Sequence, residues 1–192
     1  GAAEQYLTFE HDEFTMKPTL DGNGRLVLRD DYRISSLNCG EEDFAIACMR
    51  SNLKYGKNQK REDVKSHHYI ISFDPRDAAD NGLTVDRAQQ LGEQFCKEHF
   101  PGHQALVCTH PDGHNHSGNI HVHIVINSLR IAEVPLLPYM ERPADTREGC
   151  KHRCTDAAME YFKAEVMEMC HRENLYQIDL LNGSKNRITE RE

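Results

Sequence analysis

The stretch Ile120-His-Val-His-Ile-Val-Ile-Asn127 largely alternates apolar and polar side chains, a pattern typical of a half-buried β-strand. Successive side chains of a strand point to opposite faces, so the even-numbered residues form one apolar face. His121, His123 and Asn127 lie on the other face, together with Val125. Two imidazoles at positions i and i+2 of one face lie close enough to bind a single cation.

A third histidine joins this pair from the preceding segment. Seven of the twelve histidines fall between positions 99 and 123, and His110 follows the run 104–109, which predicts another strand. A hairpin between the two strands brings His110 alongside His121 and His123. The sequence therefore predicts a metal site made of three histidines, with other coordination positions free.

Polar residues around this cluster extend the prediction. Asp112 is suited to accept the second N–H of a ligating imidazole, and His114 and His116 in the polar loop are alternative ligands. Neutral imidazoles suit Zn, Mn, Fe or Ni, and open positions let a metal activate water or polarise a phosphoryl oxygen. The chain has no His-Glu-x-x-His pattern to supply a base for the water route. The phosphoryl route needs a separate nucleophile.

The rest of the chain predicts a single α+β domain spanning residues 1–192. Helices are expected over residues 41–54, 84–100 and 155–173, and strands over 25–29, 32–37, 67–73, 104–109 and 120–128. Thr84 and Thr155 are suited to cap the second and third of these helices. This order predicts a central antiparallel β-sheet with helices packed on one face.

Composition narrows the class of protein. The chain has 192 residues, 38% of them hydrophobic, and no apolar run approaches the ~20 residues of a membrane-spanning helix. Seven cysteines, an odd number scattered through expected helices and strands, favour reduced thiols and a cytoplasmic protein. Gly1-Ala2 resembles a cloning remnant, and Thr189–Glu192 reads like the beginning of a helix. We therefore expect a domain of a longer protein.

A basic loop interrupts an otherwise acidic chain. The net charge of −8 taken alone argues against a nucleic-acid partner, because phosphate neutralisation dominates such binding. The segment from residue 50 to residue 65, however, carries six positive charges against two carboxylates, a net charge of +4. The six side chains are Arg50, Lys54, Lys57, Lys60, Arg61 and Lys65. They are expected to bind single-stranded DNA, or else to form an ordinary solvated loop.

Several stretches resemble the conjugative relaxases, the plasmid mobilisation nucleases of the HUH endonuclease superfamily. Residues 105–112 followed by His121–Asn127 resemble the family's third motif, in which His-x-Asp precedes His-hydrophobic-His and an asparagine. Residues 67–73 are similar to the second motif, and Ser36–Cys39 to the stretch after the first. The resemblance covers nearly the whole chain. It implies the HUH-like fold, metal ligation by the three histidines with Asp112 and Asn127 supporting them, and a DNA contact by Ser72.

The resemblance also implies a tyrosine nucleophile near the N-terminus. Tyr6 matches it best, although Phe14 stands where the family usually has a lysine. Tyr32 and Tyr55 are the alternatives. Attack on DNA would leave a 5′-phosphotyrosyl link and a free 3′-OH, and the same site could later reseal the strand.

What the resemblance implies for function is strand-specific DNA nicking and strand transfer at an origin of transfer, in the bacterial cytoplasm. The implied cofactor is a divalent metal, Mn or Mg, with Zn as a further option. The implied partners are single-stranded or hairpin DNA and accessory mobilisation proteins, with no insertion into a membrane. The alternatives are a rolling-circle replication initiator, a three-histidine metal-dependent hydrolase with no DNA role, and a non-catalytic DNA-binding relative. A second zinc site at Cys150, Cys154 and Cys170-His171 is the weaker interpretation of those cysteines.

Overall fold

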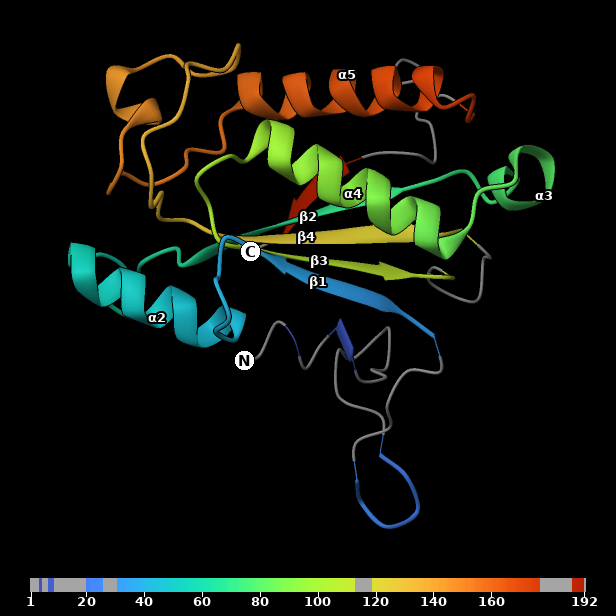
Figure 1. Ribbon diagram of the computed structural model, residues 1–192, viewed down its shortest axis with the longest axis horizontal. Coiled ribbons are helices and arrows are strands. Elements are labelled where there is room, and N and C mark those ends of the chain that lie inside the picture. Colours follow the sequence, from blue (N-terminus) through green and yellow to red (C-terminus); the bar gives the residue numbers. More distant parts are fainter. Residues whose placement is uncertain are drawn as a thin grey trace.

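The computed structural model describes residues 4, 7–8, 20–25, 31–112, 119–176 and 188–191. Its centre is a five-stranded sheet in the order β1-β3-β4-β2-β5, in which all four pairings are antiparallel (Figure 1). The strands are β1 (Arg33–Leu37), β2 (Ser66–Ser72), β3 (Ala105–His110), β4 (His121–Asn127) and β5 (Ile188–Arg191). The histidine-bearing strands β3 and β4 are therefore direct neighbours inside the sheet.

Two long helices cover one face of this sheet. Figure 1 shows α4 (Val85–His99) and α5 (Asp156–Arg172) stacked on the same side of the strands. The apolar side chains of β4 that the alternation assigns to one face, Val122, Ile124 and Ile126, are fully buried beneath them. Helix α4 approaches closely because it carries Gly92, where a Cβ would lie 2.5 Å from Cγ1 of Val122. The predicted α+β fold class is confirmed.

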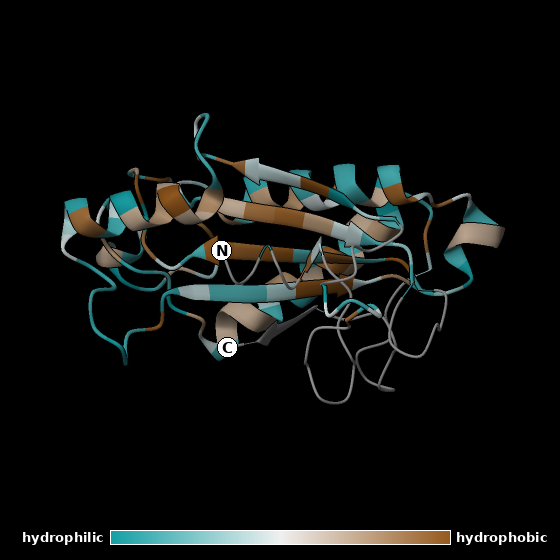
Figure 2. Cartoon of the chain, turned by 90° about the horizontal axis from the view of Figure 1, so that it is seen from below, coloured by the Kyte–Doolittle hydropathy of each residue, from teal (hydrophilic) through white to brown (hydrophobic). Residues whose placement is uncertain are grey.

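The other face of the sheet has a smaller cover. Helix α2 (Phe44–Tyr55) packs there through Phe44 and Ala47, and Figure 1 shows it on the side opposite α4. A second apolar cluster forms on this face, made of Leu7, Cys39, Phe44, Ala47, Leu106, Cys108 and Val125. Seen from that side in Figure 2, apolar stretches run along the middle of the sheet. The histidines of β4 point to this less covered face.

Most predicted elements form, with corrected ends. The hydroxyl oxygens of Thr84 and Thr155 accept from the backbone N–H groups three residues on, as expected of helix caps. Helix α2 begins at Phe44 rather than Glu41, because residues 39–42 close a turn in which the N–H of residue 42 donates to the carbonyl of Cys39. The strand expected at 25–29 falls almost wholly on residues 26–30, outside the described part.

Three short elements were not predicted. Helix α3 (Asp77–Asn81) lacks an apolar period and is closed by a hydrogen bond from Asn81 Nδ2 to Asp77 Oδ1 of 2.9 Å. The 3₁₀ helix η2 (Pro143–Thr146) lies in the proline-rich stretch. The helix expected to begin at Thr189 is wrong: Ile188–Arg191 form β5, which pairs with the open edge of β2. No helix in the described ranges is both long and apolar enough to cross a membrane.

Candidate metal centre

Three imidazoles converge on the less covered face, at one end of β3 and β4. His110 lies opposite His121 in the ladder, and His123 lies opposite Cys108. His110 Nδ1 is 3.2 Å from His121 Nε2 and 3.1 Å from His123 Nε2. One nitrogen from each ring lies within 4.8 Å of the other two, which is a spacing that a single ion can fill. The predicted convergence of the three rings is confirmed.

The outer nitrogens of these rings contact other groups of the protein. His110 Nε2 lies 2.8 Å from the carbonyl oxygen of Leu7, and His121 Nδ1 lies 3.3 Å from that of Asn119. A carbonyl only accepts, so each of these outer nitrogens carries the proton and the inner nitrogen presents its lone pair. His123 Nδ1 lies 2.8 Å from His68 Nε2. This arrangement of inner lone pairs and supported outer nitrogens is that of metal-binding histidines, so the residues fit a divalent ion.

Burial shapes access to the centre. His110 and His123 are 2% and 3% exposed, whereas His121 is half-buried at the outer end of β4. A ligand therefore reaches the centre from the side of His121. In the described residues, these three histidines are the one group of His, Cys, Asp or Glu close enough to hold an ion. The weaker interpretation of the cysteines as a second zinc site thus finds no support there.

Comparison with known proteins assigns the chain to a family. The family model for relaxases, described as a MobA/VirD2-like nuclease domain, matches residues 27–134, more than half of the chain. The match includes β3 and β4, which carry the three histidines of the centre. The chain belongs to the relaxase family.

A curated relative agrees with this assignment. This relaxase domain is 35% identical over 96 residues to "Protein rlx" of Staphylococcus aureus, and the aligned part is 50% of this chain. The aligned part is 25% of that protein, so the match spans a quarter of the relative's length. No solved structure matches the relaxase domain.

Asp112 and Asn127 are the two side chains expected to support the ligands. The outer nitrogens of the three rings contact Leu7, Asn119 and His68, and the supporting role of Asp112 stays a prediction. The prediction for Asn127 is wrong. Its amide donates to Gln104 Oε1 at 2.9 Å, at the other end of β4, six residues or about 20 Å from His121. It joins α2 to the sheet, because the same amide also lies 3.2 Å from Asn52 Oδ1.

Ser72 is the DNA-contact candidate that the fold brings to the centre. It ends β2 and pairs with His121 in the ladder, so the two side chains share a face at neighbouring positions. Ser72 is half-buried and is therefore within reach of a ligand at the open side of the centre.

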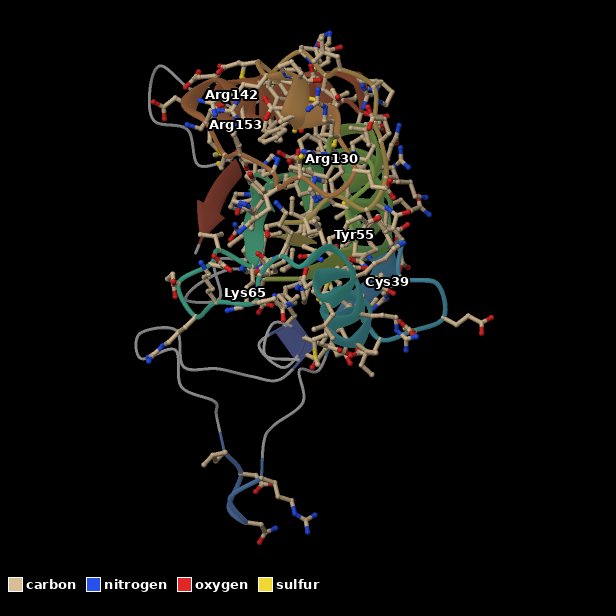
Figure 3. All side chains as sticks on the ribbon, turned by 90° about the vertical axis from the view of Figure 1, so that its left-hand side faces the viewer. Cys39, Tyr55, Lys65, Arg130, Arg142 and Arg153 are labelled. Atoms are coloured by element: carbon tan, nitrogen blue, oxygen red, sulfur yellow. The ribbon has the colours of Figure 1, made fainter. Side chains whose placement is uncertain are left out.

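Tyr32 and Tyr55, two of the three candidate tyrosines, lie at different distances from the metal centre. Tyr6 lies outside the described residues, but its neighbour Leu7 is fully buried and touches the centre through its carbonyl. Tyr32 precedes β1 and packs on the apolar cluster that contains Leu7, where a continued register would bring it opposite His110. Tyr55 ends α2 and donates to Glu148 at 2.6 Å, which raises the pKa of its hydroxyl. Figure 3 shows Tyr55 at the end of the sheet viewed there, together with Lys65 and Arg130.

The basic loop lies at this same end. Its residue Asn58 is buried and donates to Ser128 Oγ at 3.0 Å, next to the last residue of β4. Three of the six basic side chains have partners: Arg50 pairs with Glu42 at 2.6 Å, the Lys54 ammonium lies 5.2 Å from the ring centre of Tyr55, and Lys65 Nζ donates to the carbonyl of Lys60 at 3.1 Å. A DNA strand that contacts both the loop and the histidines must therefore follow the length of β4, about 20 Å.

Three groups at the centre escaped the sequence analysis: the backbone carbonyls of Leu7 and Asn119, and the side chain of His68. The backbone carbonyl of Leu7 carries no signal in a sequence. The position of His68 is indicated in part by the sequence, because alternation along β2 places it on the same face as Ser72. Its contact with His123 follows only once the pairing of β2 with β4 is known.

Proposed function

We propose that this relaxase domain nicks one DNA strand during mobilisation, with Tyr6 as the nucleophile and the three-histidine centre as the site that holds the scissile phosphate. Two observations support the proposal together: membership in a family of nuclease domains, and the inward nitrogens of His110, His121 and His123. The observation that carries it furthest is the contact of the Leu7 carbonyl with His110, because Leu7 is the residue next to Tyr6.

The histidines would hold a divalent ion through His110 Nδ1, His121 Nε2 and His123 Nε2. When bound, such an ion draws charge from the phosphate oxygens and stabilises the transition state of phosphoryl transfer. We propose Mn²⁺ or Mg²⁺ as the working ion, with Zn²⁺ as the alternative that an all-imidazole set favours. The half-buried side at His121 and Ser72 is the proposed entry for the DNA.

The proposed step is a transesterification that conserves the phosphate ester. The Tyr6 oxygen, after losing its proton, attacks phosphorus, and the bond from phosphorus to the 3′ oxygen breaks. The products are a 5′-phosphotyrosyl link and a 3′-OH, which takes up the proton. A phenol with an ordinary pKa near ~10 needs help to ionise at neutral pH. Reversal of the step by a 3′-OH reseals or transfers the strand.

The proposed partner is single-stranded or hairpin DNA at an origin of transfer. The basic residues Lys57, Lys60 and Arg61 would contact its backbone, with Arg50, Lys54 and Lys65 contributing less because each already has a partner. Residues 1–192 would act as one nuclease domain in the bacterial cytoplasm, together with accessory mobilisation proteins.

The test is adduct formation with labelled single-stranded DNA and Mn²⁺, read on a denaturing gel. We expect wild type, Tyr32→Phe and Tyr55→Phe to form a covalent protein–DNA product, and Tyr6→Phe to form none. An adduct that survives Tyr6→Phe and disappears with Tyr32→Phe would move the nucleophile to Tyr32. Cleavage without an adduct in every protein would indicate a water nucleophile and a metal-dependent hydrolase, and binding without cleavage would indicate a non-catalytic relative.

A further inference from the structure

We infer that His68 positions His123 for metal binding by accepting the proton of its outer nitrogen; the inference rests on the proposed metal centre. His68 is on β2, two residues before Ile70, which pairs with His123 in the ladder. Residues in this diagonal relation share a face and come within reach of long side chains. His68 Nε2 lies 2.8 Å from His123 Nδ1, which is an ordinary hydrogen-bond distance.

The direction of this hydrogen bond follows from the geometry of His123. Its Nε2 faces the centre, 3.1 Å from His110 Nδ1, so a bound ion would take the lone pair of Nε2. A neutral imidazole then carries its proton on Nδ1, and that N–H must donate to His68 Nε2. His68 is consequently the acceptor, with its own proton on Nδ1.

His68 differs in kind from the other two outer partners. The carbonyls of Leu7 and Asn119 can only accept, so they favour one tautomer of neutral His110 and of neutral His121. An imidazole can either donate or accept. The tautomer of His123 therefore depends on its hydrogen bond with the His68 side chain. When a metal binds His123 Nε2, only one direction of that hydrogen bond remains, with His123 as the donor and His68 as the acceptor.

A neutral acceptor also sets the charge of the centre. A carboxylate at this position would make the ligand more basic and remove one positive charge from the loaded centre. A neutral imidazole fixes the ring and leaves the full charge of a divalent ion to act on the phosphate. His68 is thus a positioning residue that acts through His123.

The first test measures Zn²⁺ affinity by competition with a chromophoric chelator, on the whole chain. We expect His68→Phe, which keeps the ring but lacks an acceptor, to weaken binding 10- to 100-fold, the range typical of outer partners. His68→Gln can present an oxygen near the position of Nε2 and should restore most of the affinity. The matched control is His67→Phe, the adjacent histidine on the opposite face, which should leave the affinity unchanged.

The second test reads the tautomer directly in wild type. Nitrogen-15 NMR of the Zn²⁺-loaded protein should show the Nε2 of His68 unprotonated and hydrogen-bonded, with the proton on Nδ1. This measurement decides the matter even if His68→Phe fails to fold. Equal affinities of wild type and His68→Phe, or a proton on His68 Nε2 in the loaded protein, would overturn the inference while leaving the centre intact. Failure of wild type to bind any divalent ion would overturn the proposed centre instead.

Discussion

The two faces of the sheet use histidine in opposite ways. His67 and His68 are adjacent on β2, yet their rings join different clusters, His68 with the metal centre and His67 with His103 and His152 under α4 and α5. In the metal centre, nitrogens face one another at 3.1–3.2 Å. The rings themselves meet edge to face in both clusters, with centroids 4.9 Å apart for His121 and His123 and for His67 and His152, so ring packing does not distinguish the two.

In the second cluster, His152 and His103 direct a nitrogen to groups other than histidines. His152 Nε2 lies 2.9 Å from the Tyr69 hydroxyl, and His103 Nδ1 lies 2.7 Å from the carbonyl of Asn127. Burial lowers the pKa of His103 to about 3, and it lowers the pKa of His152 well below its ordinary value. His103 and His152 are therefore neutral packing elements at pH 7. The comparison teaches that a histidine cluster becomes a metal site through the direction of its nitrogens.

Removing a ligand from the metal centre should have the largest effect. We expect His121→Ala to weaken metal binding by more than about 100-fold, beyond the loss typical of an outer partner, and to abolish nicking. The thermal melting temperature of the metal-free protein should stay close to that of wild type, because the ring is half-buried and the apolar face of β4 is unchanged. A large fall in the melting temperature of His121→Ala would show that the His121 ring stabilises the fold, as the histidines on the other face do, and would contradict the comparison.

The reverse result is expected on the other face. His152→Ala removes the partner of the buried Tyr69 hydroxyl and leaves a cavity, so the free energy of unfolding should fall by about 2–4 kcal/mol. Zn²⁺ affinity, measured at a temperature where the variant is folded, should match wild type. Loss of metal binding in the folded variant would show that the two clusters are coupled.

The pH dependence of stability sharpens the comparison further. His103 has a pKa of about 3 when folded and near ~6.5 when unfolded, so its stabilising contribution is complete above pH 6.5. It is lost as the pH falls from ~6.5 towards 3, by up to about 1.4 kcal/mol per pH unit, because the unfolded chain takes up the proton first. Urea unfolding of metal-free protein at several pH values should show this slope. His103→Asn should reduce it, and an unchanged slope would contradict the assignment.

The smallest effect is expected in the basic loop, at the end of β4 away from the metal centre. Lys57→Ala should weaken single-stranded DNA binding a few-fold and reduce the salt slope of the affinity by about 0.7 if the ammonium contacts one phosphate. Arg50→Ala is the matched control, since Arg50 is paired with Glu42, and it should change the slope less. Fluorescence anisotropy across a salt series measures both. Equal salt slopes for wild type and Lys57→Ala would show that the Lys57 ammonium does not contact a DNA phosphate.

Local pattern was enough to predict much of the fold and the three ligands. Alternation in 120–127 assigns His121 and His123 to one face, and the neighbouring strand ends at His110, so a simple hairpin brings them together. The caps at Thr84 and Thr155 are equally local. What could not be predicted depends on long-range register.

Asn127 and His68 illustrate that limit. Asn127 is an odd-numbered residue of β4 and so lies on the same face as His121 and His123. The alternation does not show that it lies at the other end of the strand from His121, where its partner is Gln104. His68 acts across the β2–β4 pairing, which joins residues 55 apart in sequence. The strand β5 likewise forms at the edge of β2 through pairing that a four-residue segment cannot signal.

X-ray absorption spectroscopy of the Zn²⁺-loaded chain tests the central claim most directly, since it counts the ligands of the bound ion. The account predicts one ion per chain with three imidazole nitrogens at about 2.0–2.1 Å and the remaining positions filled by oxygen. Sulfur scattering near ~2.3 Å, or fewer than three imidazoles, would contradict it.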